Sequence, residues 1–352
     1  MVDKLIQVEN LKVTFKTQGG DIEALRGVSF DISKSENVAI VGESGSGKSV
    51  TALSLLKLHD EKHVDYPDGR IIYQNRDLML ASEAEMRAIR GQDISMIFQE
   101  PMTSLNPVYP VGVQIQETLK LHKGMDRLAA RKVAIEALDR VGIKEPQQKI
   151  DSFPHMLSGG QRQRAMIAMA LACDPVLLIA DEPTTALDVT VQQQILDLLK
   201  DLQKETGMSV LLITHDLNLV RRFADRVCVM YEGEIVEQAQ SAELFKHPRH
   251  EYTQYLLDSE PESRIAEIEP GKNTVIEAEN IRVYFPVRKG FFKRKVGEVK
   301  AVDDIDVELR QGETLGIVGE SGSGKTTLGM ALLRMQDSTG RIRFRDHIIS
   351  DY

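Results

Sequence analysis

The most informative residues form a glycine-rich octet that occurs twice. Gly42-Glu43-Ser44-Gly45-Ser46-Gly47-Lys48-Ser49 fits the pattern G-x-x-x-x-G-K-[ST], and Gly319-Glu320-Ser321-Gly322-Ser323-Gly324-Lys325-Thr326 repeats it. In such a loop, glycines let backbone N–H groups approach a phosphate closely, the lysine supplies a point charge and the last hydroxyl is offered to Mg²⁺. The two octets therefore predict two sites for nucleotide phosphates.

Each octet is flanked by the elements that such a loop requires. Val38–Val41 is a short apolar run typical of a buried parallel strand, and Ser49–Lys57 predicts a helix whose positive end faces the anion. In the second copy, Thr314–Val318 and Thr326–Arg334 predict the same strand and helix. We assign the residues just after the octets to the same two sites; they are Val50 and Thr327.

The composition describes a globular chain of 352 residues, long enough for two domains, with 42% hydrophobic residues. It contains no apolar segment of membrane-spanning length, and its first residues lack a signal-peptide core. A net charge of −9 and only 5% aromatic residues argue against a general nucleic-acid binder. Cys173 and Cys228 lie in or beside apolar runs, so we expect buried thiols in a reducing compartment, not a disulfide or a metal pair.

An internal repeat organises the chain. Ala24–Phe30 precedes the first octet at the same spacing at which Ala301–Val307 precedes the second. Downstream, Gly340–Phe344 matches Gly69–Tyr73. Between the copies, an acidic segment punctuated by Pro and Gly has the composition of a linker.

This repeat predicts three segments. We expect a complete first domain over 1–259, a linker over 260–273 and the N-terminal part of a second domain over 274–352. The second copy also carries extra residues in a basic stretch, Arg288–Lys295. A solvated hairpin loop is the preferred interpretation of that stretch, and contact with anionic lipid headgroups is the alternative.

Later motifs bear on the chemistry. The apolar strand Pro175–Ala180 ends in Asp181, which could hold Mg²⁺ through water, and Glu182, which could polarise an attacking water. Leu157-Ser158-Gly159-Gly160-Gln161 begins a helix-like segment whose backbone donors can meet a second phosphate group. His215 follows another apolar strand and so stands where ligands bind in open α/β sheets. Taken singly, an acidic strand end and a surface histidine are common structural features.

The order of these motifs resembles the ATP-binding cassette (ABC) family over residues 5–245. The matching residues are Gly42–Ser49, Gln99, Leu157–Gln161, Asp181, Glu182, Asp188 and His215. Two further segments, Phe98–Pro107 and His247–Leu257, resemble the ATPases of oligopeptide and dipeptide importers. Two cassettes in one chain are similar to the fused double-cassette subunits of that group.

The resemblance implies a role for each matching residue. Phe15 would stack on adenine, with a strand-core aromatic as the structural alternative, and Phe285 matches it in the second unit. Gln99 would sense Mg²⁺ and the attacking water, Glu182 would act as general base and His215 would contact the γ-phosphate. The implied magnesium ligands are Ser49, Gln99, Asp181 and Thr326.

In this family, each ATP lies between the phosphate loop of one cassette and the LSGGQ segment of the other. Asp188 would bridge the cassettes. Ser158, Gly159, Gly160 and Gln161 would complete the site built on Lys325, not the site built on Lys48. This chain departs from the pattern because its second unit ends before a second Gln loop, LSGGQ segment, acidic pair or histidine equivalent to His215. We therefore expect that neither composite site closes within one copy.

The loop after Gln99 is a candidate docking segment. Met102, Leu105, Val108 and Tyr109 are apolar residues in a loop punctuated by proline. We expect them to present an exposed hydrophobic surface to a membrane subunit.

These inferences combine into one expectation. The fold class is α/β, a P-loop NTPase cassette with a mostly parallel central sheet, an antiparallel edge layer near Gly69–Tyr73 and a helical subdomain around Pro107–Ala172. The implied function is a Mg²⁺- and ATP-dependent ATPase subunit of a peptide importer at the cytoplasmic face of the inner membrane. Its partners would be two permease subunits, an extracytoplasmic peptide-binding protein and a second cassette, with no nucleic acid. A soluble cassette protein acting on ribosomes or DNA and an exporter ATPase are the alternatives.

Overall fold

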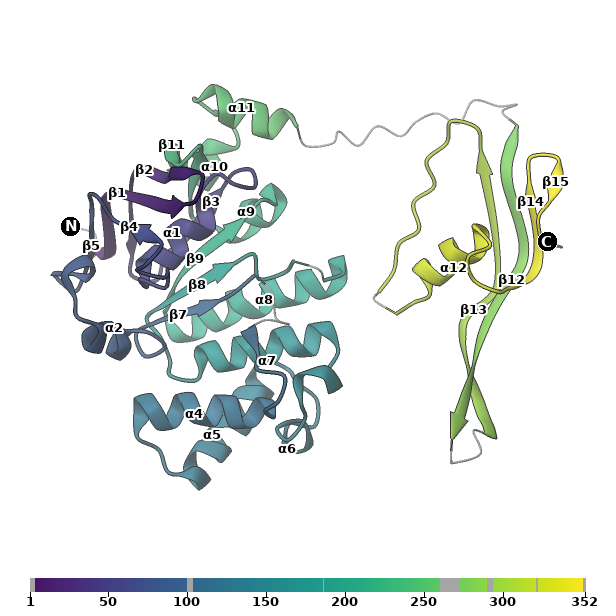
Figure 1. The fold of residues 1–352 in the computed structure, drawn as a ribbon, viewed down its shortest axis with the longest axis horizontal. Coiled ribbons are helices and arrows are strands. Elements are labelled where there is room, and N and C mark those ends of the chain that lie inside the picture. The colour runs from purple at the N-terminus through teal and green to yellow at the C-terminus, as the bar shows by residue number, and fades with distance from the viewer. Residues whose placement is uncertain are drawn as a thin grey trace. The chain divides into compact units, whose positions relative to one another are not determined.

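The computed structural model describes residues 4–99, 104–185, 187–259, 273–289, 294–320 and 322–350. The chain divides into two units, each described by itself below (Figure 1). The first unit comprises Met1–Leu187 and Val191–Pro261, and the second comprises Asp188–Thr190 and Glu262–Tyr352.

A six-stranded sheet forms the centre of the first unit, in the order β11-β10-β3-β9-β8-β7. Its strands are β3 (Asn37–Val41), β7 (Ile94–Ile97), β8 (Leu177–Asp181), β9 (Ser209–Thr214), β10 (Arg226–Tyr231) and β11 (Glu234–Gln240). Neighbours are parallel except β11, which is antiparallel to β10. Because every residue of β3, β8 and β9 is buried, these strands are near-continuous apolar runs, as strands covered on both faces require. The prediction of a mostly parallel central sheet is confirmed.

The strand β3 joins two hydrophobic cores. Its residues Ala39 and Val41 belong to a core shared with the helical part of the unit, whereas Val38 and Ile40 belong to a core shared with the antiparallel sheet. Alternate side chains of a strand point to opposite faces, so this one strand is fixed from both sides. The strand that leads into the first octet is therefore held firmly in place.

An antiparallel sheet packs beside the central one. Its order is β2-β1-β5-β6, and β4 also pairs with β1. The strands are β1 (Lys4–Thr17), β2 (Gly20–Ser33), β4 (Val64–Asp65), β5 (Arg70–Tyr73) and β6 (Arg76–Asp77). The predicted antiparallel layer near Gly69–Tyr73 is confirmed, and it also includes residues 4–33, because β1 and β2 form a long hairpin.

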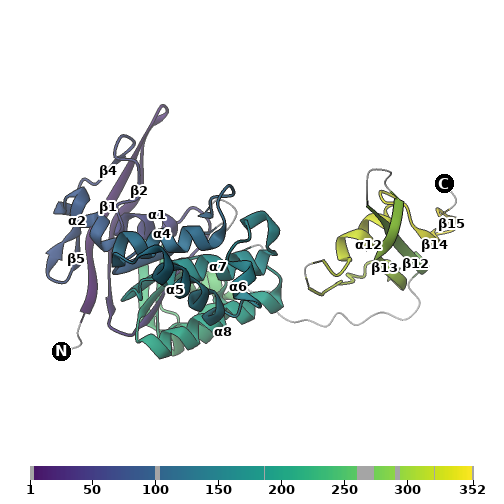
Figure 2. The same cartoon turned by 90° about the horizontal axis from the view of Figure 1, so that it is seen from below.

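Helices cover the central sheet and continue into a separate helical layer (Figure 2). The α-helices of the first unit are α1 (Lys48–Leu55), α2 (Glu83–Ile89), α4 (Val111–Lys123), α5 (Arg127–Arg140), α6 (Pro146–Lys149), α7 (Gly159–Leu171), α8 (Val189–Thr206), α9 (Leu217–Phe223), α10 (Ser241–Leu244) and α11 (Glu251–Asp258). Two short 3-10 helices accompany them, η1 (Leu78–Leu80) and η2 (Pro154–Met156). The layer formed by α4, α5, α6 and α7 confirms the predicted helical subdomain around Pro107–Ala172.

Both cysteines of the chain lie inside the first unit. Cys173 and Cys228 are buried and free, as the sequence predicts. Burial raises the pKa of both thiols, that of Cys228 to about 12. Within the described residues, no helix is both long enough and apolar enough to cross a bilayer.

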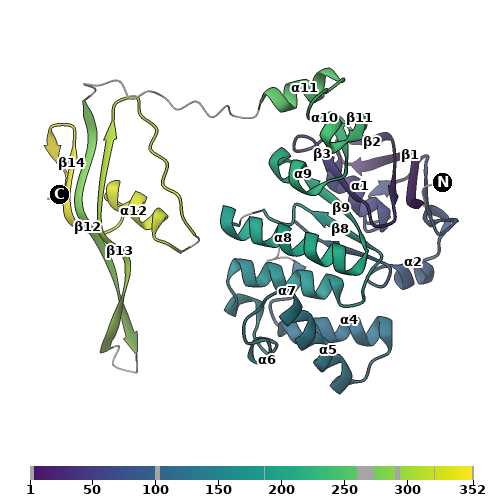
Figure 3. The ribbon, with the colours of Figure 1, turned by 180° about the vertical axis from the view of Figure 1, so that it is seen from behind.

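Between residues 273 and 350, the described part of the second unit consists of a four-stranded antiparallel sheet and one helix (Figure 3). Its elements are β12 (Thr274–Lys289), β13 (Arg294–Arg310), α12 (Lys325–Leu332), β14 (Thr339–Phe344) and β15 (His347–Ile348). Lys289 of β12 pairs with Arg294 of β13, and residues 290–293 of the basic stretch lie outside the described part. The linker residues 260–272 also lie outside it.

The predicted strand at Thr314–Val318 is wrong. These residues form no strand, and Leu315, Ile317 and Val318 are 45%, 43% and 92% exposed. In the first unit, the equivalent β3 pairs with β9 and β10, which follow the octet at a long distance in the sequence. The described part of the second unit has no counterpart of either strand, so an apolar run lacks the partners that would turn it into a strand.

Candidate nucleotide site

The first octet is a tight loop between β3 and α1. Gly42 has φ 154° and Gly47 has φ 105°. A Cβ on Gly42 would lie 2.1 Å from the Met230 carbonyl oxygen, and a Cβ on Gly47 would lie 2.8 Å from the Met230 methyl carbon. Only glycine fits this close approach to β10, which is why the pattern needs glycine at these positions.

Lys48 is folded back over its own loop. Its Nζ donates hydrogen bonds to the carbonyl oxygens of Gly42 at 2.8 Å and Glu43 at 2.7 Å, and the side chain is buried. Burial lowers the pKa of Lys48, against the negative charges of Glu182, Asp181 and Glu43, which raise it. The two bonds hold the ammonium group inside the phosphate-binding loop. A phosphate oxygen can there accept a hydrogen bond from the third ammonium N–H.

Ser49 and Asp181 form the metal-binding half of the site. Ser49, in the first turn of α1, donates from Oγ to Asp181 Oδ1 at 3.1 Å. Asp181 ends β8 and is 4% exposed; burial raises its pKa, while the Ser49 hydroxyl and Lys48 oppose that shift. Hydroxyl and carboxylate oxygens are the donors that Mg²⁺ prefers, so this pair fits the ion. The described residues contain no group of three or more His, Cys, Asp or Glu side chains arranged for a metal.

Glu182 stands beside Asp181 at the centre of a hydrogen-bond cluster. Its Oε2 accepts from Gln99 Nε2 at 2.8 Å and from Thr185 Oγ1 at 2.9 Å, and its Oε1 lies 2.9 Å from His215 Nδ1. Burial raises the pKa of Glu182, but the bonds from His215, Thr185 and Gln99 outweigh it, so the pKa is lowered. The carboxylate is therefore ionised at neutral pH and able to accept a proton.

The cluster unites three residues that the sequence analysis chose separately. Gln99 follows β7, Glu182 follows β8 and His215 follows β9, so all three stand at carboxyl ends of parallel strands. Thr185 was missed. The only sequence signal for it is its place three residues after Glu182 in the same turn, which resembles many loop threonines.

Hydrogen bonds within the LSGGQ segment hold its shape. Ser158 caps α7: its Oγ accepts from the Gln161 backbone N–H at 3.3 Å, and Gln161 Oε1 accepts from the Ser158 N–H at 3.2 Å. A Cβ on Gly160 would lie 2.9 Å from Val191 Cγ1, so the segment packs tightly against α8. Asp188 directly precedes α8. No hydrogen bond recorded among the described residues joins Ser158–Gln161 to Lys48 or Glu182.

Phe15 lies in β1, where it is partly buried. Its ring makes an edge contact with His59 at 5.3 Å between centroids, and it packs against the antiparallel-side core. The adenine role of Phe15 stays a prediction, because the ring already serves the core on one side. The equivalent Phe285 in β12 is 40% exposed.

The second octet repeats the loop geometry of the first. Lys325 Nζ donates to the carbonyl oxygens of Gly319 at 2.7 Å and Glu320 at 2.6 Å, and α12 begins at Lys325 after Gly324 in the left-handed conformation. Thr326 and Thr327 occupy the first turn of α12. Ser321 lies outside the described residues.

The docking prediction for the loop after Gln99 is partly wrong. Leu105 is 1% exposed and belongs to the helical-side core, together with apolar side chains of α4, α5 and α7. Val108 and Tyr109 are 69% and 52% exposed. Met102 lies outside the described residues. A groove of about 490 Å³ lined by Tyr109, Val113 and Met125 adjoins the exposed pair.

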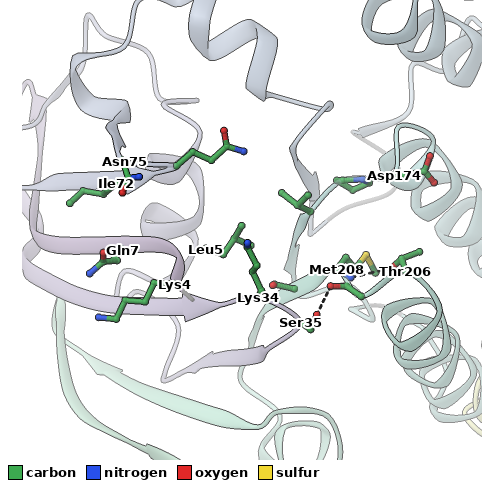
Figure 4. Close-up of a pocket in the computed structure, with 15 residues that line it drawn as sticks. Lys4, Leu5, Gln7, Lys34, Ser35, Ile72, Asn75, Asp174, Thr206 and Met208 are labelled. Atoms are coloured by element: carbon green, nitrogen blue, oxygen red, sulfur yellow. Dashed lines mark hydrogen bonds between the residues drawn. The ribbon is translucent and has the colours of Figure 1, made fainter. Parts of the chain in front are cut away.

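A separate cavity of about 630 Å³ lies at the other end of the central strands (Figure 4). Its lining includes Lys34 and Ser35 before β3, Val176 before β8, and Met208 before β9. These are the amino ends of the strands, whereas the site residues stand at the carboxyl ends. The cavity is therefore distinct from the candidate nucleotide site.

Comparisons with known proteins agree with this geometry. The family model described as ABC transporter matches residues 25–185 and 302–351. Among the relatives, the peptidoglycan transport ATP-binding protein YejF of Agrobacterium fabrum is 53% identical over 99% of this chain and 64% of its own length. The uncharacterized ABC transporter ATP-binding protein YejF of Escherichia coli is 51% identical over 98% of this chain and 65% of its own length. The glutathione import ATP-binding protein GsiA of Salmonella typhimurium is 47% identical over 95% of this chain and 59% of its own length.

Solved structures carry the same fold. The dimeric ATP-binding cassette MJ0796, in a post-hydrolysis state bound to ADP and Pi, is 32% identical with a TM-score of 0.60, over 67% of this chain and 98% of its own. The cbiO1 protein of Clostridium perfringens, part of the ABC transporter complex cbiONQ, is 30% identical with a TM-score of 0.59, over 70% of this chain and 92% of its own. The chain thus spans a full cassette of known fold, but less than two thirds of the length of the YejF relatives.

Proposed function

This chain belongs to the ABC transporter family, and from that premise we propose that its first unit binds and hydrolyses ATP. The observation that carries the proposal is the cluster around Glu182, which joins Gln99, Thr185 and His215 at one sheet edge beside the Ser49–Asp181 pair. A phosphate-binding loop alone occurs in many nucleotide proteins. A partly buried, hydrogen-bonded carboxylate beside it supplies the base that hydrolysis needs.

The residues divide the work as follows. The octet and Lys48 bind the β- and γ-phosphates through backbone N–H groups and the ammonium charge. Ser49 and Asp181 would hold Mg²⁺, and the ion would supply positive charge against the charge that develops on the phosphate oxygens. Glu182 would accept the proton of the attacking water and Gln99 would orient that water, while His215, which is hydrogen-bonded to Glu182, would contact the γ-phosphate.

We further propose that the protein is the ATPase subunit of an importer for peptides or peptide-like compounds. Two kinds of relative support this: a YejF named for peptidoglycan transport and a GsiA named for glutathione import. In this role it would lie at the cytoplasmic face of the inner membrane against two permease subunits, fed by an extracytoplasmic binding protein. The groove beside Tyr109 and Val113 offers the permeases an apolar surface.

The second unit is proposed to be the N-terminal part of a second cassette. Its hairpin, octet and α12 repeat the order of the first unit. Composite sites, in which Ser158 and Gly160 face Lys325, would require a complete second cassette or a second copy. The dimeric form of the solved cassette relatives supports such pairing.

ATP binding by the purified chain tests the core of this proposal. Binding is measured with and without Mg²⁺ in the parent, in Lys48→Ala and in Lys144→Ala, an exposed lysine that serves as the matched control. We expect Lys48→Ala to lose at least about tenfold in affinity, because a charge-assisted contact to phosphate is removed. Equal affinity in all three proteins would refute the site.

Peptide uptake in cells tests the importer role. Tyr109→Asp places a charge in the proposed permease surface, and Leu80→Asp, at an exposed apolar residue in η1, is the control. We expect uptake to fall in Tyr109→Asp alone while ATP binding by the purified protein is retained. Unchanged uptake in Tyr109→Asp contradicts the assignment of this surface.

A further inference from the structure

The C-terminal helix of the first unit touches the phosphate loop. Tyr252, in the first turn of α11, is 7% exposed. Its hydroxyl oxygen accepts a hydrogen bond from the backbone N–H of Glu43 at 3.1 Å. Glu43 is the second residue of the octet, so α11 supplies a side chain that holds the loop itself.

The Tyr252 ring is fixed against the strand next to β3. It packs on Tyr231 at 4.2 Å between ring centroids, with the two planes inclined by 34°. Tyr231 is the last residue of β10, which pairs in parallel with β3. The hydroxyl therefore has a defined position relative to the strand that leads into the octet.

α11 is itself tied to the sheet edge. His250 Nδ1 accepts from the Tyr252 backbone N–H at 3.2 Å and so caps the helix. The carboxylate of Glu237, in β11, accepts from the backbone N–H groups of Arg249 and His250, each at 3.0 Å. Figures 1 and 3 show α11 following α10 at the end of the unit where β11 lies. The helix cannot swing away without breaking these bonds.

Glu43 connects Tyr252 with the lysine of the loop. Its carbonyl oxygen accepts from Lys48 Nζ at 2.7 Å, while its N–H is held by Tyr252. The tip of the loop has a different support, because the Gly233 N–H donates to the Ser46 carbonyl at 2.9 Å. Within the described part of the chain, the Tyr252 hydroxyl connects α11 with Glu43, whose carbonyl oxygen accepts from Lys48.

We propose that Tyr252 is a positioning residue for the nucleotide site: by holding the Glu43 backbone, α11 sets the loop in the shape that directs Lys48 at the phosphates. The helix after the last strand thereby becomes part of the nucleotide-binding apparatus. This inference rests on the proposed ATP site in the first unit.

Substitution of the hydroxyl alone tests the proposal. Tyr252→Phe keeps the ring and its packing on Tyr231 but removes the acceptor for the Glu43 N–H. We expect the Kd for MgATP of the full chain to rise about threefold to tenfold, the worth of one hydrogen bond. The matched control is Tyr255→Phe, the same substitution one turn later at a residue that is 61% exposed, and its Kd should equal that of the parent.

Two further measurements separate positioning from simple stability. A purely structural Tyr252 would lower the melting temperature of the nucleotide-free protein and leave the Kd unchanged, which overturns the proposal. Hydrogen exchange of the Glu43 amide, measured on the unliganded parent, should be slow and should speed up in Tyr252→Phe. Fast exchange of that amide in the parent overturns the proposal without any variant. If Lys48→Ala binds MgATP like the parent, the ATP site itself fails, and the exchange experiment still decides the contact.

Discussion

At the scale of single residues, the site depends on how one carboxylate is held. Glu182 has φ 44°, a left-handed backbone that non-glycine residues rarely adopt, and three side chains converge on its two oxygens. Such strain is kept only where the surroundings enforce it. The arrangement lowers the pKa of Glu182 although burial of the group opposes this shift.

The first prediction concerns Glu182 as the base. Glu182→Gln keeps the size of the side chain and removes its ability to take a proton. ATP binding should be retained, and turnover should fall by about 10²-fold or more, within the usual worth of acid–base catalysis. Glu136→Gln, at an exposed glutamate in α5, is the control. Lys48→Ala first establishes that the measured ATPase activity belongs to the first unit. If Glu182→Gln then turns over ATP at the parental rate, another group is the base.

The second prediction concerns Thr185, which donates to the same carboxylate. Thr185→Val removes a hydrogen bond that stabilises the charged form, so the pKa of Glu182 rises. The base must be ionised to act. The acidic limb of the pH profile of kcat/KM should therefore move to higher pH, and Thr185→Ser should restore it. An acidic limb at the parental position in Thr185→Val contradicts this role.

At the scale of elements, the two octets show what a local pattern can and cannot predict. Val38–Val41 and Thr314–Val318 are both apolar runs before a glycine, and both predict a strand. The first is a strand because β9 and β10 flank it, and those partners follow it at a long sequence separation. The second has no such partners in the described residues. Hydrogen bonding between distant strands, not local composition, decides the outcome.

The same limit applies to the site. The sequence predicts Lys48, Asp181, Glu182 and His215 as site residues, because each lies in a motif that follows an apolar strand. Parallel strands end at a common edge of the sheet, where such residues meet. The contributions of Thr185 and Tyr252 could not, since each depends on a hydrogen bond set by tertiary packing. Leu105 was misjudged for a related reason: a loop residue is buried only if helices cover it.

The third prediction compares the two equivalent valines that precede the octets. Val41 is fully buried and Val318 is 92% exposed. Val41→Asp should lower the free energy of unfolding of the first unit by at least about 3 kcal/mol, because it buries an unpaired charge. Val318→Asp should change the stability of this chain by less than about 0.5 kcal/mol. Urea denaturation followed by circular dichroism measures both; losses of similar size would mean that the second segment is also buried.

At the scale of the whole molecule, only the first unit contains a full set of candidate catalytic residues. The second unit has the loop and Lys325, and residues 326–352 contain neither an LSGGQ segment nor an Asp-Glu pair. Hydrolysis by this chain is therefore expected to come from the first unit. If a productive site also needs Ser158 from another molecule, two copies must associate head to tail.

The fourth prediction follows from that requirement. ATPase activity per molecule should rise with protein concentration, Lys48→Ala should abolish activity and Lys325→Ala should leave most of it. A concentration series of the purified chain with both variants measures this. Activity that survives Lys48→Ala, or a rate strictly proportional to concentration over the whole range, contradicts the head-to-tail arrangement.

The two thiols have a practical consequence for experiments on this molecule. Cys173 and Cys228 are buried, neutral at physiological pH because their pKa values are raised, and both belong to the first unit, while the second unit has no cysteine. An alkylating reagent reacts only with an accessible thiolate. The alkylation rate under native conditions therefore reports the opening of the first unit alone. Comparing this rate with and without nucleotide would measure how much nucleotide binding suppresses that opening.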